Sequence, residues 1–244
     1  GFADAIAAAK KADVIILAMG EKWDMTGEAA SRVELGFPGT QDALMKELKK
    51  LGKPMVLVLM SGRPMTINWA NDNLDSILHT WYAGTQGGHA IADVLFGDVN
   101  PSGKLSATFP QNVGQVPIYY SHKNTGRPMA NGEWFKKFTS NYLDVTNEPL
   151  YPFGFGLSYT TFDISAPKLD KTTMSMDGSI TVSVTVKNTG NRDGAEVVQL
   201  YIRDLVGTIT RPVKELKGFQ KVMLKAGETK EVSFILHNES LKFY

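Results

Sequence analysis

Apolar runs and helical apolar stripes alternate along the first hundred residues. Continuous apolar runs bounded by turn residues are typical of parallel strands buried on both faces, and spacings of three and four are typical of helices. The predicted strands are 14–19, 54–60 and 75–80, with 104–109 as a candidate fourth, and the predicted helices are 3–11, 41–51 and 87–96. This alternation predicts an α/β sandwich, a mostly parallel sheet with helices on both faces.

The apolar period changes to two after Phe162. Ile180, Val182, Val184 and Val186 alternate with polar residues, which indicates a half-buried strand. Further strands fit 196–203, 216–224 and 229–236, separated by polar turns. Short strands with regular turns predict an antiparallel sandwich of the immunoglobulin or fibronectin type III kind. We count about five of its roughly seven strands, so we expect this domain to be clipped at its C-terminal end, as the parallel sheet is at its N-terminal end.

Residues 110–160 have little periodicity and many prolines, glycines and aromatic side chains. So many large apolar groups favour an ordered connector that packs against other parts of the protein. The predicted domains are therefore an α/β domain over 1–110, an aromatic-rich connector over 111–160 and a fibronectin-like domain over 161–244.

Composition narrows the function classes. A net charge of +1 over 244 residues gives no electrostatic case for nucleic acid or an anionic membrane. The apolar run 55–60 is far too short to span a bilayer, and the first eleven residues lack the pattern of a signal peptide. The chain has no cysteine, which excludes disulfides and thiolate metal sites.

The most informative segment is residues 20–32, between the first predicted strand and the next helix. It carries Glu21 and Glu28, the indole of Trp23, and Arg32. Loops at the carboxyl ends of parallel strands are where open α/β sheets place ligand chemistry. Carboxylates beside an aromatic platform suit a carbohydrate, whose leaving oxygen needs a proton during cleavage.

Each residue of this loop also has a structural interpretation. Gly27 lets the chain aim Glu28 into a cleft, but Glu28 could instead pair with Arg32 on the first turn of a helix. Glu21 could contact a ligand or sit as an anion near a helix start. Trp23 could be a sugar platform or a plug against a neighbouring domain.

Three other features of the sequence give weaker evidence for a functional site. The glycines of 81–88 match neither nucleotide-binding fingerprint and fit tight turning before a helix. The segment 61–64 (Ser-Gly-Arg-Pro) resembles a turn leaving a strand and is not a nucleophile elbow. The four histidines are dispersed and no acidic cluster has ligand spacing, so the sequence predicts neither a metal nor a cofactor.

Several of these segments together resemble glycoside hydrolase family 3 β-glucosidases, particularly the bacterial periplasmic type. The matching segments are 52–64, 80–88, 92–105, 119–128, 151–160 and 211–219. The resemblance covers nearly the whole chain in the right order. It implies a longer protein in which an N-terminal TIM barrel, absent from this sequence, supplies the nucleophilic aspartate and most sugar contacts.

The resemblance assigns roles to the loop. Relatives with a Gly-Glu-Ala-x-Ser-Arg loop are thought to use its glutamate as acid/base, which corresponds to Glu28; Glu21 is the fallback, because the family places this residue inconsistently. Trp23 and Arg32 are the expected substrate contacts. The implied reaction is retaining hydrolysis of terminal β-glucosyl residues, and the chain alone is expected to be inactive.

The implied partners are a β-glucoside or oligosaccharide and the barrel, with a homodimer as a further option and a periplasmic or secreted location. Two alternatives stay open. One is a non-catalytic binding or scaffolding module, and the other a family 3 enzyme acting on xylosides, arabinosides or N-acetylglucosaminides.

Overall fold

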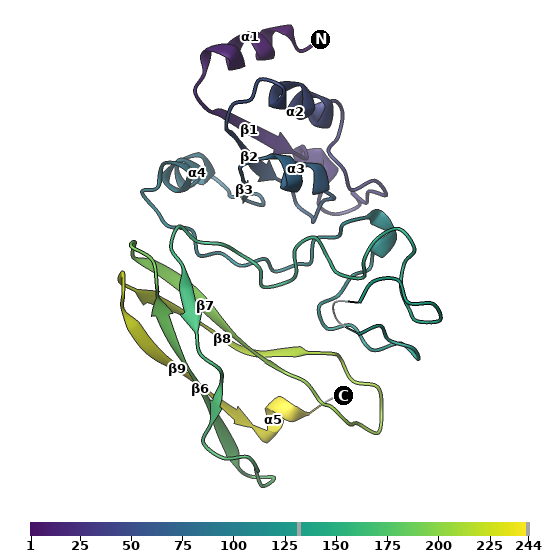
Figure 1. Cartoon of the computed structure of the whole chain (residues 1–244), viewed down its shortest axis with the longest axis vertical. Helices are drawn as coiled ribbons and strands as arrows, with labels where there is room; N and C mark the ends of the chain where they lie inside the picture. Colours follow the sequence, from purple (N-terminus) through teal and green to yellow (C-terminus); the bar gives the residue numbers. More distant parts are fainter. Residues whose placement is uncertain (131–132, 243–244) are drawn as a thin grey trace. The chain divides into compact units, whose positions relative to one another are not determined.

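The computed structural model describes residues 1–130 and 133–242. The chain divides into two compact units (Figure 1). The first unit comprises Gly1–Ala92, Ala107–Ile118 and Met129–Pro152, and the second comprises Asp93–Ser106, Tyr119–Pro128 and Phe153–Tyr244. The predicted connector is thus shared between the units. Residues 131–132 of that connector and 243–244 of the predicted β-sandwich lie outside the described residues.

A parallel sheet in the order β1-β2-β3 forms the centre of the first unit, as predicted. Its strands are β1 (Ile15–Gly20), β2 (Met55–Met60) and β3 (Ser76–His79). The helices are α1 (Ala3–Lys11), α2 (Gln41–Lys49), α3 (Asn68–Asn73) and α4 (Gly87–Phe96), and the short 3-10 helices are η1 (Trp23–Met25) and η2 (Val113–Gln115). Helix α2 forms where it was predicted because its apolar stripe buries Met45 and Leu48.

The two longer strands differ in burial. In the central strand β2, Leu57 and Leu59 on one face have no exposed surface and Val58 on the other face is 3% exposed, as expected for a strand covered on both faces. In β1 the odd-numbered Ile15 and Leu17 are buried, whereas Ile16 is half exposed. The prediction that β1 is buried on both faces is therefore wrong for the described residues, because the face that carries Ile16 and Ala18 lacks cover.

The candidate strand at 104–109 is also wrong. The connector supplies its backbone partners, so the segment does not join β3. In the first unit, the Phe109 N–H donates to the Tyr151 carbonyl at 2.9 Å and the Leu150 N–H to the Phe109 carbonyl at 2.9 Å. In the second unit, the Leu105 N–H donates to the Phe155 carbonyl at 2.8 Å. This pairing leaves one isolated bridge in place of a strand.

The second unit contains the predicted antiparallel β-sandwich. Its elements are β4 (Phe162–Ile164), β5 (Lys168–Leu169), β6 (Ser179–Asn188), β7 (Gly194–Ile202), β8 (Glu215–Leu224), β9 (Thr229–His237) and the short helix α5 (Asn238–Leu241). Strand β6 pairs with β4, β5 and β9, and β7 pairs with β8. The buried side chains of Val186, Val198, Leu224 and Val232, one from each long strand, form the core between the two sheets.

The aromatic residues of the connector pack only in part. Tyr120 stacks on Phe153 with ring centroids 4.3 Å apart and meets Tyr201 edge to face. In contrast, Trp134 and Phe138 are more than half exposed. The expectation of packing therefore holds within the second unit for Tyr120, but not for residues 134–138 within the described chain.

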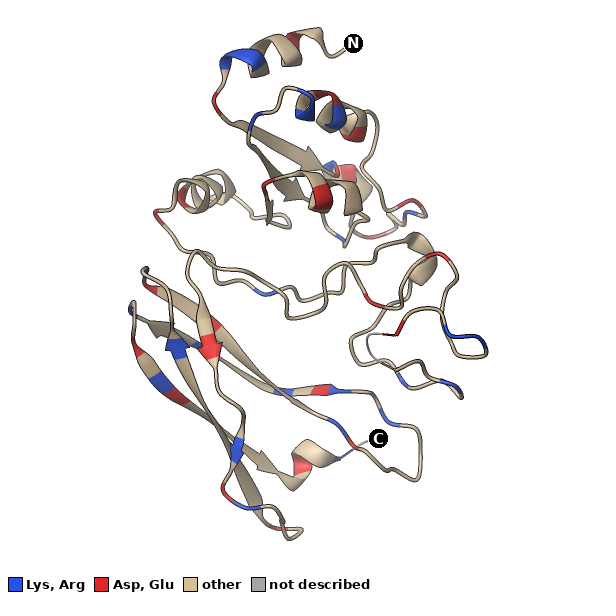
Figure 2. Ribbon diagram, in the orientation of Figure 1, with Lys and Arg blue, Asp and Glu red and all other residues tan. Residues whose placement is uncertain are grey.

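Charged residues of both signs are interspersed through both units (Figure 2). Within ranges 1–130 and 133–242, no helix combines the length and the apolar composition that crossing a membrane requires.

A histidine at the end of β3 is enclosed by aromatic rings. The His79 ring lies edge-on to Trp81, with centroids 4.2 Å apart, and to Phe109, at 5.1 Å. Burial lowers the pKa of His79 to about 4, although the Leu59 backbone offsets part of the effect. The imidazole is therefore neutral near pH 7 and serves as a packing group.

The depressed pKa of His79 predicts a pH-dependent stability. The unfolded chain binds the proton below about pH 6.5, whereas the folded chain resists it down to about pH 4. Stability is thus lost as the pH falls through this window. Allowing for solvent screening of a partly exposed ring, we expect a loss of about 1–2 kcal/mol that His79→Phe removes. Denaturant titrations from pH 7 to 4.5 measure it, with the exposed His89→Gln as control. Identical pH slopes for wild type and His79→Phe would contradict this assignment.

Candidate functional site

The ends of β1 and β2 lie side by side and define the site. Register pairs Gly20 with Met60, so the loops that follow both strands leave the same edge of the sheet. Gly20 has a φ of +140°, and a Cβ there would collide with the Met60 backbone. Only glycine fits this close approach, which brings Glu21 beside the segment that follows β2.

Helix α2 fixes the end of β1 from the other side. The side-chain amide of Gln41 accepts a hydrogen bond from the Gly20 N–H at 2.8 Å and donates one to the Gly20 carbonyl at 2.9 Å. The start of α2 is therefore tied to the last residue of β1. Both ends of the intervening loop, residues 21–40, are anchored to the sheet.

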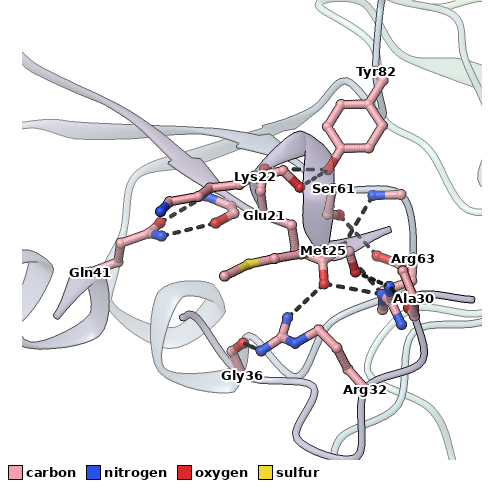
Figure 3. Close-up of polar contacts among 12 residues, drawn as sticks. Glu21, Lys22, Met25, Ala30, Arg32, Gly36, Gln41, Ser61, Arg63 and Tyr82 are labelled. Atoms are coloured by element: carbon pink, nitrogen blue, oxygen red, sulfur yellow. Dashed lines mark hydrogen bonds and ion pairs between the residues drawn. The ribbon is translucent and has the colours of Figure 1, made fainter. Parts of the chain in front are cut away.

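The Glu21 side chain has no exposed surface and lies between two arginines (Figure 3). Its Oε1 lies 2.6 Å from Arg32 Nη1 and 3.0 Å from Arg63 Nε. The Gly62 N–H approaches its Oε2 at 3.4 Å. We call Glu21, Arg32 and Arg63 the Glu21 anchor. Two guanidinium groups balance the single buried carboxylate, which meets the requirement that a buried charge be paired.

The Glu21 anchor also binds the loop backbone. Arg63 Nη2 donates to the carbonyl of Met25 and, at 2.7 Å, to the carbonyl of Ala30. Arg32 Nη2 donates to the Gly36 carbonyl at 3.1 Å. One buried ionic cluster therefore holds three carbonyls of a loop that has little regular structure of its own (Figure 3).

Glu28 lies in a tight turn between the two carbonyls that Arg63 binds. The Ala30 N–H donates to the Gly27 carbonyl at 3.3 Å, which closes the turn with Glu28 and Ala29 at its centre. Glu28 is exposed, and within the described ranges no hydrogen bond or ion pair engages its carboxyl. Ala29 has a φ of +57°, a conformation that costs an L-residue on the order of 1 kcal/mol. The turn is held in this shape by its surroundings.

The structural alternative, in which Glu28 pairs with Arg32 on the first turn of a helix, is wrong. Residues 28–32 form no helix, and the guanidinium of Arg32 is engaged by Glu21 and Gly36. The Arg32 side chain is 19% exposed, so most of it is unavailable to a ligand. The role of Arg32 as a substrate contact stays a prediction.

Trp23 begins η1, and the residue is 86% exposed. The indole therefore does not pack within its own unit. This position is compatible with a sugar platform and with a contact to polypeptide outside this chain, the two interpretations that the sequence leaves open.

The loop after β3 leaves the same edge of the sheet as the loops after β1 and β2. The Tyr82 hydroxyl donates to the backbone carbonyls of Glu21 at 3.3 Å and Lys22 at 3.2 Å (Figure 3). Partial burial raises the pKa of Tyr82, and the charge of Glu21 adds to the rise. The hydroxyl thus keeps the proton that it donates, and it braces the start of the loop.

Sequence reasoning missed Arg63. It lies 42 positions from Glu21, in a segment interpreted only as a turn. One observation could have found it. Glu21 directly follows β1 and Arg63 follows the neighbouring β2, so opposite charges meet at the carboxyl ends of adjacent parallel strands.

Comparison with known proteins identifies the family. Residues 1–159 match the glycosyl hydrolase family 3 C-terminal domain, and residues 196–244 match a fibronectin type III-like domain. The chain belongs to glycosyl hydrolase family 3. The predicted fold, an α/β domain followed by a fibronectin-like β-sandwich, is confirmed.

Particular relatives extend this result. The chain is 55% identical to the periplasmic beta-glucosidase of Salmonella typhimurium, covering 99% of this chain and 31% of the relative. It is 46% identical to a beta-xylosidase of Formosa agariphila, covering 99% of this chain and 32% of the relative. The crystal structure of a Listeria innocua beta-glucosidase in complex with glucose superposes with a TM-score of 0.95 at 44% identity, covering 99% of this chain and 34% of that one. The chain thus spans about a third of the length of these relatives.

Substitutions of the two glutamates in the loop should affect stability to very different extents. Glu21→Gln leaves two largely buried guanidinium groups without their counter-charge, so we expect the free energy of unfolding to fall by about 2–4 kcal/mol. Glu28→Gln alters an exposed carboxyl and should change it by less than about 0.5 kcal/mol. Denaturant titration of both variants of the 244-residue chain measures the difference. Equal losses would show that the Glu21 anchor does not organise the loop.

Proposed function

We propose that this chain is the C-terminal part of a retaining β-glucosidase and that Glu28 is its acid/base residue. The observation that carries the proposal is the contrast between the two carboxyls of one loop. Glu21 has no exposed side-chain surface and is enclosed by Arg32 and Arg63, whereas Glu28 is presented outward on an anchored turn. A residue that protonates a sugar oxygen must reach it, which favours Glu28 over Glu21.

Each step of the proposed reaction assigns one role to this chain. A carboxylate from the preceding barrel attacks the anomeric carbon while the glycosidic bond breaks, and Glu28 transfers its proton to the departing oxygen. Glu28, now a carboxylate, takes a proton from water as that water attacks the same carbon. The bond between that carbon and the barrel carboxylate breaks in the same step, and both carboxyl groups return to their starting states.

The substrate class follows from the named relatives. The Salmonella and Listeria proteins are beta-glucosidases, which supports a β-glucoside. The Formosa beta-xylosidase, at 46% identity, supports a β-xyloside as the alternative. In our proposal the barrel selects between these sugars, since it supplies most sugar contacts. The name of the Salmonella relative supports a periplasmic location.

Loss of the proton donor predicts a specific kinetic defect. In the full-length enzyme, Glu28→Gln should lower kcat/KM for an alkyl β-glucoside about 10²–10⁴-fold, because the departing alkoxide then leaves without a proton. Glu34→Gln, an exposed glutamate six positions along the chain, is the matched control and should retain activity. An active Glu28→Gln enzyme would refute the proposed role.

Separation of the two carboxyl groups predicts that the 244-residue chain alone is inactive. It lacks the proposed nucleophile, so we expect no hydrolysis of aryl β-glucosides or aryl β-xylosides above background. Turnover by the purified chain that disappears in its Glu28→Gln variant would show that all the required groups lie within these residues.

A further inference from the structure

We propose that Arg63 is the positioning residue of the acid/base, setting the place of Glu28 from the end of strand β2. This inference rests on the proposed function. It adds that the geometry of the proton donor is controlled by a residue 35 positions away that does not itself contact the sugar.

The guanidinium group of Arg63 contacts both the Glu21 carboxylate and the backbone of the loop that carries Glu28. Arg63 Nε faces the Glu21 carboxylate at 3.0 Å, and Nη2 donates to the carbonyls of Met25 and Ala30. These carbonyls flank Glu28, three residues before it and two residues after it. Arg63 therefore holds both ends of the turn that presents Glu28. The Arg63 side chain is 19% exposed, and the Glu21 carboxylate balances the charge of its guanidinium group.

The backbone that carries Arg63 is held in place by buried contacts. Met60 ends β2, a strand in which Leu57 and Leu59 have no exposed surface, and Arg63 follows three positions later. The Ser61 hydroxyl donates to the Arg63 carbonyl at 2.9 Å, and Ser61 has no exposed surface. The backbone from which the guanidinium group extends is thus fixed to the sheet.

A second contact joins the same two segments. The Thr26 side chain packs against Gly62 so closely that a Cβ on residue 62 would collide with it. The loop therefore lies directly against residues 61–63. Gly62→Ala would push the loop away while it leaves Glu21, Arg32 and Arg63 unchanged.

The side-chain chemistry explains why arginine is required. The guanidinium group presents several N–H donors in a fixed plane, so one group can serve a carboxylate and two carbonyls together. A lysine ammonium is a compact point charge and cannot reproduce this fork. Arg63→Lys keeps the charge that Glu21 needs but releases at least one of the two loop carbonyls.

Displacement of Glu28 has a kinetic signature that a general loss of stability lacks. A misplacement of about 1 Å can cost about 10²-fold in rate. The rate falls for substrates whose leaving group must be protonated as it departs. The displacement spares substrates such as dinitrophenyl β-glucoside, whose leaving group departs as a stable anion.

The test compares two substrates in the full-length enzyme. We expect Arg63→Lys to lower kcat/KM about 30–100-fold for an alkyl β-glucoside and less than about 3-fold for dinitrophenyl β-glucoside. Gly62→Ala should show the same selectivity, and it replaces Arg63→Lys if that variant fails to fold. Arg203→Lys, an exposed arginine of the second unit, is the control. Equal losses on both substrates would overturn the inference.

A double mutant separates this inference from the proposed function. If Arg63 acts through Glu28, Glu28→Gln with Arg63→Lys should be within about 3-fold of Glu28→Gln alone. If the losses in kcat/KM of the two single variants multiply in the double variant, the positioning role of Arg63 is refuted, while Glu28 remains the acid/base. Full activity of Glu28→Gln would refute both.

Hydrogen exchange on the 244-residue chain tests the Arg63 contacts without catalysis. Arg63→Lys should increase exchange of the amides in residues 25–31, where Arg203→Lys does not. Unchanged exchange in this segment would also overturn the inference.

Discussion

The buried carboxylate of Glu21 is the interaction on which the rest of the site depends. A carboxylate without solvent exposure is tolerated only when cations and hydrogen-bond donors surround it, and here Arg32, Arg63 and the Gly62 N–H do so. The same two guanidinium groups extend to three loop carbonyls. An irregular loop thereby acquires a defined shape without a helix or strand of its own, and its exposed residues become a presented surface.

This arrangement divides the work between two glutamates seven positions apart. Glu21 is buried and fixes the loop, whereas Glu28 is exposed to solvent in a turn whose next residue, Ala29, has a positive φ. Strain in such a turn persists only where its surroundings hold it, and here Arg63 binds on both sides. In the proposed enzyme, whose catalytic groups come from separate domains, contacts that fix the loop of Glu28 to the sheet would help to hold the reacting distance.

Local patterns predicted most of the elements, and non-local contacts account for the failures. Helix α2 and strand β6 formed where their apolar periods placed them. The segment 104–109 had the pattern of a strand but paired with the connector, and β1 left Ile16 half exposed because its outer face has no cover. The choice of the loop as the candidate site followed from its position and residue types. The division between Glu21 and Glu28 did not, since it depends on Arg63, whose contact with Glu21 spans 42 positions.

The most direct test of the account is the separation between the Glu28 carboxyl and the nucleophilic carboxyl of the barrel, measured in a crystal structure of the full-length enzyme with a bound sugar analogue. The account predicts about 5–5.5 Å, the spacing of a retaining pair, with the Glu28 carboxyl within hydrogen-bond distance of the glycosidic oxygen. A Glu28 carboxyl more than about 10 Å from the nucleophile, with a different carboxyl at the glycosidic oxygen, would contradict it.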